Sequence, residues 1–363
     1  MALRDVPIVQ GQPLPAEVSP ATTRFLVLHE YPTPSHERFW RDFLARVDAP
    51  AHYDSPEYFL EPYWVGQQPF AVLAFDAGQV IGVVTGIHRE DRIVSGLAER
   101  PQIKILPGSS LAASQRLAEG LILEAGRKKV IVVFSWSDAP LDGLNESGFA
   151  RREGVGVVTL DLKPGADALF KKFSENRRRN IRLASKAGIE IGEAVTPGDT
   201  MDYWAVYSAW RNTKRKVILH DRTFDMIETV HRLRSNHRRF LARLNGKVIA
   251  ATGLRFYSGG MVEYANNCSL DEFLWLHPND LLAWKTIQWA CENGFTKYCC
   301  GSADSFFRRL GGTMQPICRY RLDRTFLHRY ELEENLRAKV RAMEQRSRKL
   351  IRETVAKLTR RDH

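Results

Sequence analysis

Residues 240–254 read Phe240-Leu-Ala-Arg-Leu-Asn-Gly-Lys-Val-Ile-Ala-Ala-Thr-Gly-Leu254. Two β-rich runs flank Asn245-Gly246, a dipeptide that favours a two-residue hairpin turn because both positions tolerate positive φ. The same order occurs earlier, in Phe70-Ala-Val-Leu-Ala-Phe-Asp-Ala-Gly-Gln-Val-Ile-Gly-Val-Val-Thr-Gly-Ile87, and both copies place Val-Ile just after the turn. The chain therefore contains an internal repeat that begins with a β-hairpin.

A helix and a further strand are expected downstream of each hairpin. In the first half we expect them at 110–126 and 129–134, and in the second half at 279–294 and 297–300. The second of these helices has apolar residues at helical spacing, and Gly294 follows where a left-handed residue ends a helix. A helix that joins two strands of one sheet predicts an α/β fold, with mixed, mostly antiparallel sheets flanked by helices.

The repeat divides the chain into four expected segments. These are an N-terminal extension over 1–22, a first domain over 23–165, a second domain over 166–328 and a basic amphipathic helix over 329–363. The boundary between the domains is placed at Asp161-Leu-Lys-Pro-Gly165, because Pro and Gly cluster there after a strand-like run. The length of 363 residues and the 44% hydrophobic composition allow two ordinary cores.

Composition and cysteine usage exclude several classes of protein. Apolar runs are far shorter than the roughly 20 residues of a membrane helix, and no continuous apolar stretch of a signal peptide is present, so we expect no transmembrane segment and a cytoplasmic location. The five cysteines are an odd number without a Cys-x-x-Cys pair, which fits neither a disulfide framework nor a zinc site. We expect buried, reduced cysteines and no metal.

The net charge of +11 and a pI near 9.5 indicate a surface that attracts anions, among them nucleic acid, acidic lipid headgroups, CoA and nucleotide sugars. Charge alone does not choose among them. The stretch Lys171 to Lys186 holds seven basic residues against one acidic residue, Glu175, on what reads as a helix. Solvated helix faces usually mix the two signs, so this stretch is a candidate anion site.

Three stretches of the second half contain a further pattern. The first is Phe173-Ser-Glu-Asn-Arg-Arg-Arg-Asn-Ile-Arg-Leu-Ala-Ser-Lys-Ala-Gly-Ile189, and the second is His277-Pro-Asn-Asp-Leu-Leu-Ala-Trp-Lys-Thr-Ile-Gln-Trp-Ala290. The third is Lys297-Tyr-Cys-Cys-Gly-Ser302, followed by Phe306-Phe-Arg-Arg-Leu-Gly-Gly312. In this order they resemble the FemAB-like branch of the GNAT superfamily of acyltransferases.

The resemblance implies two tandem GNAT-like domains and the transfer of an acyl or aminoacyl group to an amine. The carrier would be an acyl-CoA or an aminoacyl-tRNA, and the acceptor an amino sugar or another cell-envelope or polysaccharide precursor. Two departures from the family pattern leave a non-catalytic anion-binding module open. Arg308 and Arg309 stand where the family has a lysine, and a guanidinium barely titrates. The Gln/Arg-x-x-Gly-x-Gly phosphate loop of ordinary GNAT enzymes is absent.

Four residues are candidates for chemistry near the start of the helix at 279–294. Asn279 and Asp280 begin that helix, where free N–H groups favour a carrier phosphate, although both side chains could simply cap it. Asp280 is a candidate for orienting or deprotonating the amine. Tyr264, on the preceding strand, could protonate the leaving group. Strand alternation places Glu263 on the opposite face and Asn266 on the face of Tyr264, where it could bind the acceptor.

Arginines are the candidates for binding the carrier. Arg178 and Arg179 can bind phosphate bidentately, and Asn180 could accompany them. By its position in the family pattern, the Arg308-Arg309 pair would bind the same carrier.

The terminal helix has an apolar seam that includes Leu336, Val340 and Met343 beside many basic residues. The seam could pack on the body of the protein. Alternatively, the cationic face could draw the enzyme to an anionic membrane surface or polymer.

Overall fold

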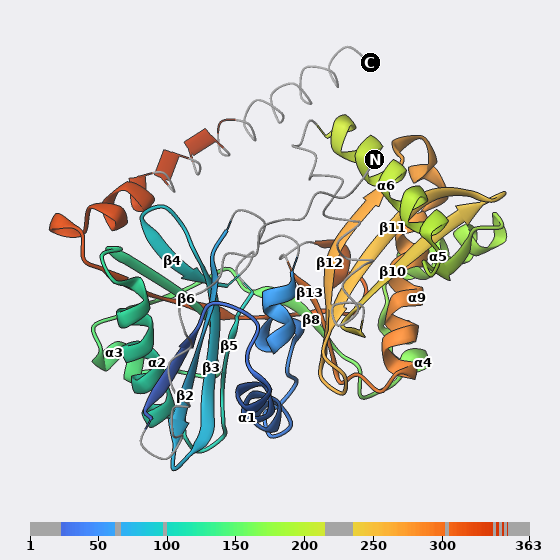
Figure 1. The fold of residues 1–363 in the computed structure, drawn as a ribbon. Helices are drawn as coiled ribbons and strands as arrows, with labels where there is room; N and C mark the ends of the chain where they lie inside the picture. Colours follow the sequence, from blue (N-terminus) through green and yellow to red (C-terminus); the bar gives the residue numbers. More distant parts are fainter. Residues whose placement is uncertain are drawn as a thin grey trace, which may run out of the picture.

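A computed structural model describes residues 23–61, 67–96, 100–214, 235–301 and 305–336, and in the terminal helix residues 339, 340, 343, 344 and 347. The expected extension over 1–22 lies outside these residues. The described chain forms two lobes, each built around its own sheet (Figure 1). No helix in the described part is long and apolar enough to cross a membrane.

The first sheet has the strand order β1-β2-β3-β4-β6-β15-β7, and β5 also pairs with β3. Its strands are β1 (Phe25–Leu28), β2 (Pro69–Asp76), β3 (Gln79–His88), β4 (Arg92–Ser95), β5 (Ile103–Ile105), β6 (Val130–Trp136), β7 (Ala150–Glu153) and β15 (Ile317–Asp323). On one face it packs against α2 (Ser110–Ala125) and α3 (Asp142–Glu146), and on the other against α1 (Pro34–Leu44). Short 3₁₀ turns at His52–Asp54 and Pro56–Leu60 follow α1.

The second sheet has the order β14-β8-β13-β12-β11-β10-β9. Its strands are β8 (Val157–Asp161), β9 (Glu190–Glu193), β10 (His237–Leu244), β11 (Lys247–Phe256), β12 (Met261–Ser269), β13 (Lys297–Gly301) and β14 (Thr313–Gln315). One face is covered by α4 (Ala166–Lys172), α5 (Glu175–Lys186) and α9 (Pro278–Glu292), and part of the other by α6 (Pro197–Thr213). The short helix α10 (Ser305–Arg308) follows β13.

The internal repeat is confirmed in detail. The two hairpins turn at Ala77-Gly78 and Asn245-Gly246, and all four residues have positive φ. Each hairpin also has a register shift at the same distance before its turn, between Ala74 and Phe75 and between Ala242 and Arg243. In each half a helix then leads to a strand that runs parallel to its neighbour, in the pairs β4·β6 and β12·β13. The expected fold class, two GNAT-like mixed sheets flanked by helices, is therefore correct.

The two sheets exchange strands across the expected domain boundary. β8 precedes residue 165 in the chain but pairs with β13 and β14 in the second sheet. β15 lies within the expected second domain, 166–328, but pairs with β6 and β7 in the first sheet. The domain boundary at residue 165 therefore stays a proposal. The two sheets do not divide the chain at that residue, because each contains a strand from the other side of it.

The terminal helix begins on the first sheet. The start of the terminal helix is held on the first sheet by ion pairs, in which Arg319 and Arg321 bind Glu334 at 2.7 Å each. Its apolar seam does not pack on the body, because Leu336, Val340 and Met343 are 64, 47 and 67% exposed. All five cysteines are free, and four of them are buried, as expected.

Candidate functional site

The two parallel strands at the centre of the second sheet separate soon after they begin. β12 and β13 are paired over Met261–Glu263 and Lys297–Cys299 only, although β12 continues to Ser269. The helix α9 follows β12 after a 3₁₀ turn at Asp271–Leu276, and no side chain caps it. Pro278 has no N–H and the Asp280 N–H donates to the His277 carbonyl at 3.1 Å, which leaves the Asn279 N–H and the helix dipole to favour an anion near the point where the strands part.

A β-bulge in β12 decides which side chains face each other. Tyr264 lies opposite Leu254 and Asn266 lies opposite Gly253, so Ala265 is an extra residue in the strand. Because Leu254 and Gly253 are consecutive residues of β11, their partners lie on opposite faces of the sheet. The expectation that Asn266 shares the face of Tyr264 is wrong for this reason, and Asn266 lies on the face of Glu263 instead.

Tyr264 lies against aromatic rings of β13 and α10. Its ring contacts Phe307 edge to face at 4.8 Å and Tyr298 at 6.4 Å between centroids. Burial raises the pKa of its phenol above the usual value, so the side chain is a neutral O–H donor at physiological pH. Arg100, from the first half, donates a hydrogen bond of 2.7 Å to the Tyr264 carbonyl oxygen.

Asp280 is engaged by the helix that the sequence marked as basic. Its Oδ1 accepts a 2.6 Å hydrogen bond from Arg177 Nη1, and its Oδ2 lies 3.5 Å from Asn180 Nδ2. The Arg177 guanidinium also lies 4.4 Å from the centroid of the Phe306 ring. These contacts join the starts of α5 and α9 to α10. Sequence reasoning missed Arg177, although it lies one turn before Asn180 on the same helix face.

Neither candidate residue at the start of α9 caps the helix. The N-cap is His277, whose backbone is left-handed with φ of 58°. Asn279 donates to Ser269 Oγ at 3.2 Å, and its own Oδ1 is buried without a hydrogen-bond partner among the described residues. Asp280 is 4% exposed and bonds to α5 as described above. The capping interpretation therefore does not apply to either side chain.

The predicted carrier-binding arginines lie around Ser174, the N-cap of α5. Ser174 N–H donates to the Arg309 carbonyl at 2.9 Å, and Arg178 N–H donates to the Ser174 carbonyl at 3.1 Å. Arg308 and Arg309 are exposed and Arg178 is half-buried, whereas Arg179 donates to Asn176. We define the basic cluster as follows: Lys171, Lys172, Arg178, Arg308 and Arg309. None of its members forms an ion pair with an acidic side chain that the structure describes.

A row of polar residues crosses the opposite face of the second sheet. The strand register places His237, Arg255, Glu263 and Cys299 side by side on β10 to β13. Burial raises the pKa of Glu263 to about 7, although Arg100 lowers it. Glu263 Oε2 has no hydrogen-bond partner in the described part of the chain. A buried carboxyl that titrates near neutral pH is a candidate proton acceptor.

A buried ion pair joins this face to the first half. Arg255 Nε lies 2.5 Å from Glu61 Oε1, and His52 Nε2 lies 2.7 Å from the same oxygen. The side chains of Arg255, Glu61 and His52 are fully buried. Burial alone would raise the pKa of Glu61, but Arg255 and His52 lower it to about 2. The pair is therefore charged, and it holds the lobes in one arrangement.

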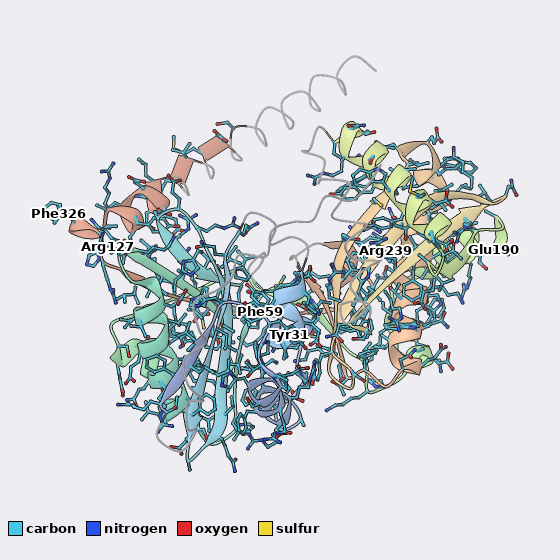
Figure 2. The ribbon with its side chains drawn as sticks, in the orientation of Figure 1. Tyr31, Phe59, Arg127, Glu190, Arg239 and Phe326 are labelled. Atoms are coloured by element: carbon cyan, nitrogen blue, oxygen red, sulfur yellow. The ribbon has the colours of Figure 1, made fainter. Side chains whose placement is uncertain are left out.

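Asn266 belongs to the same polar face. Its Oδ1 accepts a 2.8 Å hydrogen bond from Tyr203 of α6, and the guanidinium of Arg239 lies 4.6 Å from the centre of the Tyr203 ring. Arg239 lies opposite Gly253, which in turn lies opposite Asn266. Figure 2 shows Arg239 on the second sheet. Polar side chains from β10, β12 and α6 thus meet on the face of Glu263, two residues along β11 from the position that pairs with it.

A cavity of about 820 Å³ lies between α1 and the second half, but it is not part of this site. It is lined by Glu37 and Arg41 of α1 and by Gly259 and Thr296. The last two residues precede β12 and β13, whereas the strands part beyond Glu263. The cavity therefore opens at the other end of the two parallel strands.

Comparisons with known proteins agree with this geometry. Residues 171–309 match the family model described as an acetyltransferase (GNAT) domain. FemX is similar in structure, with a TM-score of 0.64 and 13% identity over 82% of this chain and 97% of that one. A comparison with curated protein sequences finds no match.

Two further solved structures share the architecture. A tandem GNAT protein from the clavulanic acid biosynthesis pathway has a TM-score of 0.52 and 10% identity, over 83% of this chain and 99% of that one. The L-PGS of Bacillus licheniformis has a TM-score of 0.55 and 10% identity, over 81% of this chain and 92% of that one. The chain thus has the fold of the FemAB-like, GNAT-type acyltransferases, with a GNAT domain in its second half, as the resemblance implied.

Proposed function

We propose that the protein is an N-acyltransferase that moves an acyl group from acyl-CoA to an amine where β12 and β13 part. The observation that supports this most directly is the separation of these strands beyond Glu263 and Cys299, beside the uncapped start of α9. A thioester carbonyl placed there would lie close to Tyr264.

The chemistry of the step requires two proton transfers. The amine nitrogen attacks the thioester carbonyl, a C–N bond forms, and the C–S bond breaks. The amine loses a proton to a base, and the departing thiolate gains one from an acid. Tyr264 is assigned the acid role because burial keeps its phenol protonated. Glu263, on the opposite face at the last paired position before the strands part, is assigned the base role because its pKa of about 7 suits an acceptor of protons at neutral pH.

Asp280 and Asn180 are assigned to positioning. Arg177 neutralises the Asp280 carboxylate, so that its repulsion of a phosphate at the start of α9 is reduced. The Asn180 side chain is buried and its amide is directed at Asp280, so it has little surface with which to contact a ligand. Deprotonation of the amine is therefore assigned to Glu263 rather than to Asp280.

The carrier phosphates are assigned to the start of α9, with Asn279, and to the basic cluster. Exposed guanidinium groups on Arg308 and Arg309, with Arg178 one helical turn from Ser174, offer planar forks for phosphate oxygens. The exposed Arg179 extends the same surface.

The acceptor is assigned to the polar face that holds Asn266, Arg239 and Tyr203. Hydroxyl and amide groups there suit an amine with further polar groups, such as an amino sugar or a cell-envelope precursor. The terminal helix is assigned a recruitment role in a cytoplasmic enzyme. Its seam is exposed at Leu336 and Met343, and its basic residues would attract anionic lipid.

An aminoacyl-tRNA donor is the second candidate. The similarity to FemX extends over both halves of the chain, and the glycine-rich phosphate loop of ordinary GNAT enzymes is missing from the sequence. The basic cluster suits the tRNA backbone as well as it suits CoA.

Turnover with a panel of donors tests the proposal. Free thiol released from acetyl-CoA and longer acyl-CoAs, and label transferred from aminoacyl-tRNA, are measured with a panel of amines. We expect thiol release that depends on the amine, and a loss of about 100-fold or more in kcat for Tyr264→Phe. Tyr257→Phe, at the other end of the strands, is the matched control and should keep full activity. If transfer occurs from aminoacyl-tRNA and from no acyl-CoA, the donor is aminoacyl-tRNA and the acyl-CoA proposal is wrong. No transfer from any donor would favour an anion-binding module.

A further inference from the structure

Three potential metal ligands meet in the first half, away from the site described above. His29 follows β1, His88 is the last residue of β3, and Glu124 lies in the last turn of α2. The order β1-β2-β3 in the sheet and the packing of α2 on these strands bring the three together. They are far apart in the sequence, by 95 residues between His29 and Glu124, so no local motif predicts the group.

The geometry of the three side chains suits one ion. His29 Nε2 lies 2.9 Å from Glu124 Oε2, and His88 Nε2 makes a short contact with the other oxygen, Oε1. One potential ligand atom from each of the three residues lies within 4.8 Å of the other two. Ligand atoms around a tetrahedral zinc ion lie roughly 3.3 Å apart, so small side-chain shifts would place all three on one ion.

The surroundings leave the carboxylate without a fixed positive partner. Glu124 is 8% exposed at its side chain, and among the described residues it forms ion pairs with the two histidines and with no Lys or Arg. The ring of His88 is held edge to face by Phe70, at 5.4 Å between centroids. Its Nε2, which contacts Glu124, is the ring nitrogen directed into the group, and its Nδ1 is buried without a partner that the structure describes.

We propose that His29, His88 and Glu124 bind a divalent first-row transition-metal ion of the zinc type. Two imidazole nitrogens and one carboxylate are a ligand set that zinc accepts, with water in the fourth position. Water can reach the site from the side of His29, whose side chain is 62% exposed. The ion would connect the edge strand β1 to β3 and α2, and it would therefore stabilise the first half. The proposal departs from the expectation of no metal, which rested on the cysteines.

Zinc titration of the full-length, metal-stripped protein tests the proposal. By isothermal calorimetry we expect one equivalent of Zn²⁺ to bind the unmodified protein. Changes to residues that only support metal ligands cost about 10- to 100-fold in affinity, so loss of a ligand in His29→Ala or His88→Ala should cost at least about 100-fold. The control His36→Ala removes a histidine of α1 outside the group and should leave the affinity unchanged.

A second measurement covers variants that fold poorly. Zn²⁺ should raise the melting temperature of the unmodified protein and of His36→Ala, but not that of His29→Ala, whose substitution is at the exposed ligand. The proposal is overturned if the folded, unmodified protein binds no Zn²⁺, or if His29→Ala binds it as tightly as the control. In either case the group is a His–Glu–His hydrogen-bond network. Neither readout uses acyl transfer, so both are independent of the proposed function.

Discussion

Replacement of Glu263 by Gln should change how the stability of the protein depends on pH. Glu263 is 2% exposed, and burial raises its pKa from 4.5 to about 7, with Asp54 and Glu61 adding to the effect and Arg100 opposing it. Between pH 4.5 and 7 the carboxyl is ionised in the unfolded chain but protonated in the folded protein. The folded state then binds one more proton, and the free energy of unfolding falls as the pH rises through this range.

The size of the effect follows from the shift. A pKa raised from 4.5 to about 7 corresponds to about 3 kcal/mol of lost stability above pH 7, of which about 2.5 kcal/mol is lost between pH 5 and pH 8. Gln has nearly the same shape and does not ionise. The free energy of unfolding of Glu263→Gln minus that of the unmodified protein should therefore increase by about 2.5 kcal/mol over that range.

Urea unfolding followed by tryptophan fluorescence at several pH values measures this difference. The other titratable groups are present in both proteins, so their contributions cancel unless the substitution alters them. The matched control is Glu190→Gln, an exposed carboxyl on the edge strand β9 (Figure 2). The reasoning is refuted if the difference for Glu263→Gln stays constant from pH 5 to pH 8, because the carboxyl would then be ionised throughout in the folded protein.

Three further outcomes follow from the structure. Arg255→Met should lower the free energy of unfolding by about 3 to 5 kcal/mol in urea, because it removes the arginine from the buried Glu61 carboxylate and leaves that charge with His52, and a loss below about 1 kcal/mol would contradict the role of this pair. Arg178→Ala and Arg309→Ala should each raise the KM of the phosphate-bearing donor about 10- to 100-fold, while an unchanged KM would remove them from the carrier site. Deletion of 337–363 keeps the ion pairs of Glu334. It should abolish salt-sensitive binding to anionic vesicles, while turnover of a small amine continues. The recruitment proposal fails if the full-length protein does not bind these vesicles at low salt.

The features that could be predicted from the sequence are those with a local signal. Asn245-Gly246 identified a hairpin because its two positive φ values are a property of two adjacent residues. The helix at 278–292 was predictable for the same reason, since apolar spacing and the flanking Pro278 and Gly294 are read from neighbouring positions. The basic residues of α5 were also visible, although the residue that contacts Asp280 proved to be Arg177.

The features that could not be predicted depend on contacts between distant segments. Glu61 and Arg255 are 194 residues apart, and neither belongs to a pattern that names its partner. The bulge at Ala265 is set by how β12 pairs with β11, so strict alternation gave the wrong face for Asn266. The exchange of β8 and β15 between sheets likewise has no signature at either strand, because nothing in either sequence identifies the strands with which it pairs.

The first half helps to shape the candidate site although it contributes none of the proposed reacting groups. Arg100 crosses from the first half and donates to the carbonyl of Tyr264, at the bulge of β12. At the end of β13, Gly301 has φ of 79°, and a Cβ atom there would lie 2.4 Å from Arg100 Nη2. A side chain at 301 would therefore displace Arg100, and with it a hydrogen bond that holds the backbone of Tyr264. Together with the buried pair of Glu61 and Arg255, this contact makes the position of the phenol depend on how the two halves pack, which gives a physical reason for one chain to keep both.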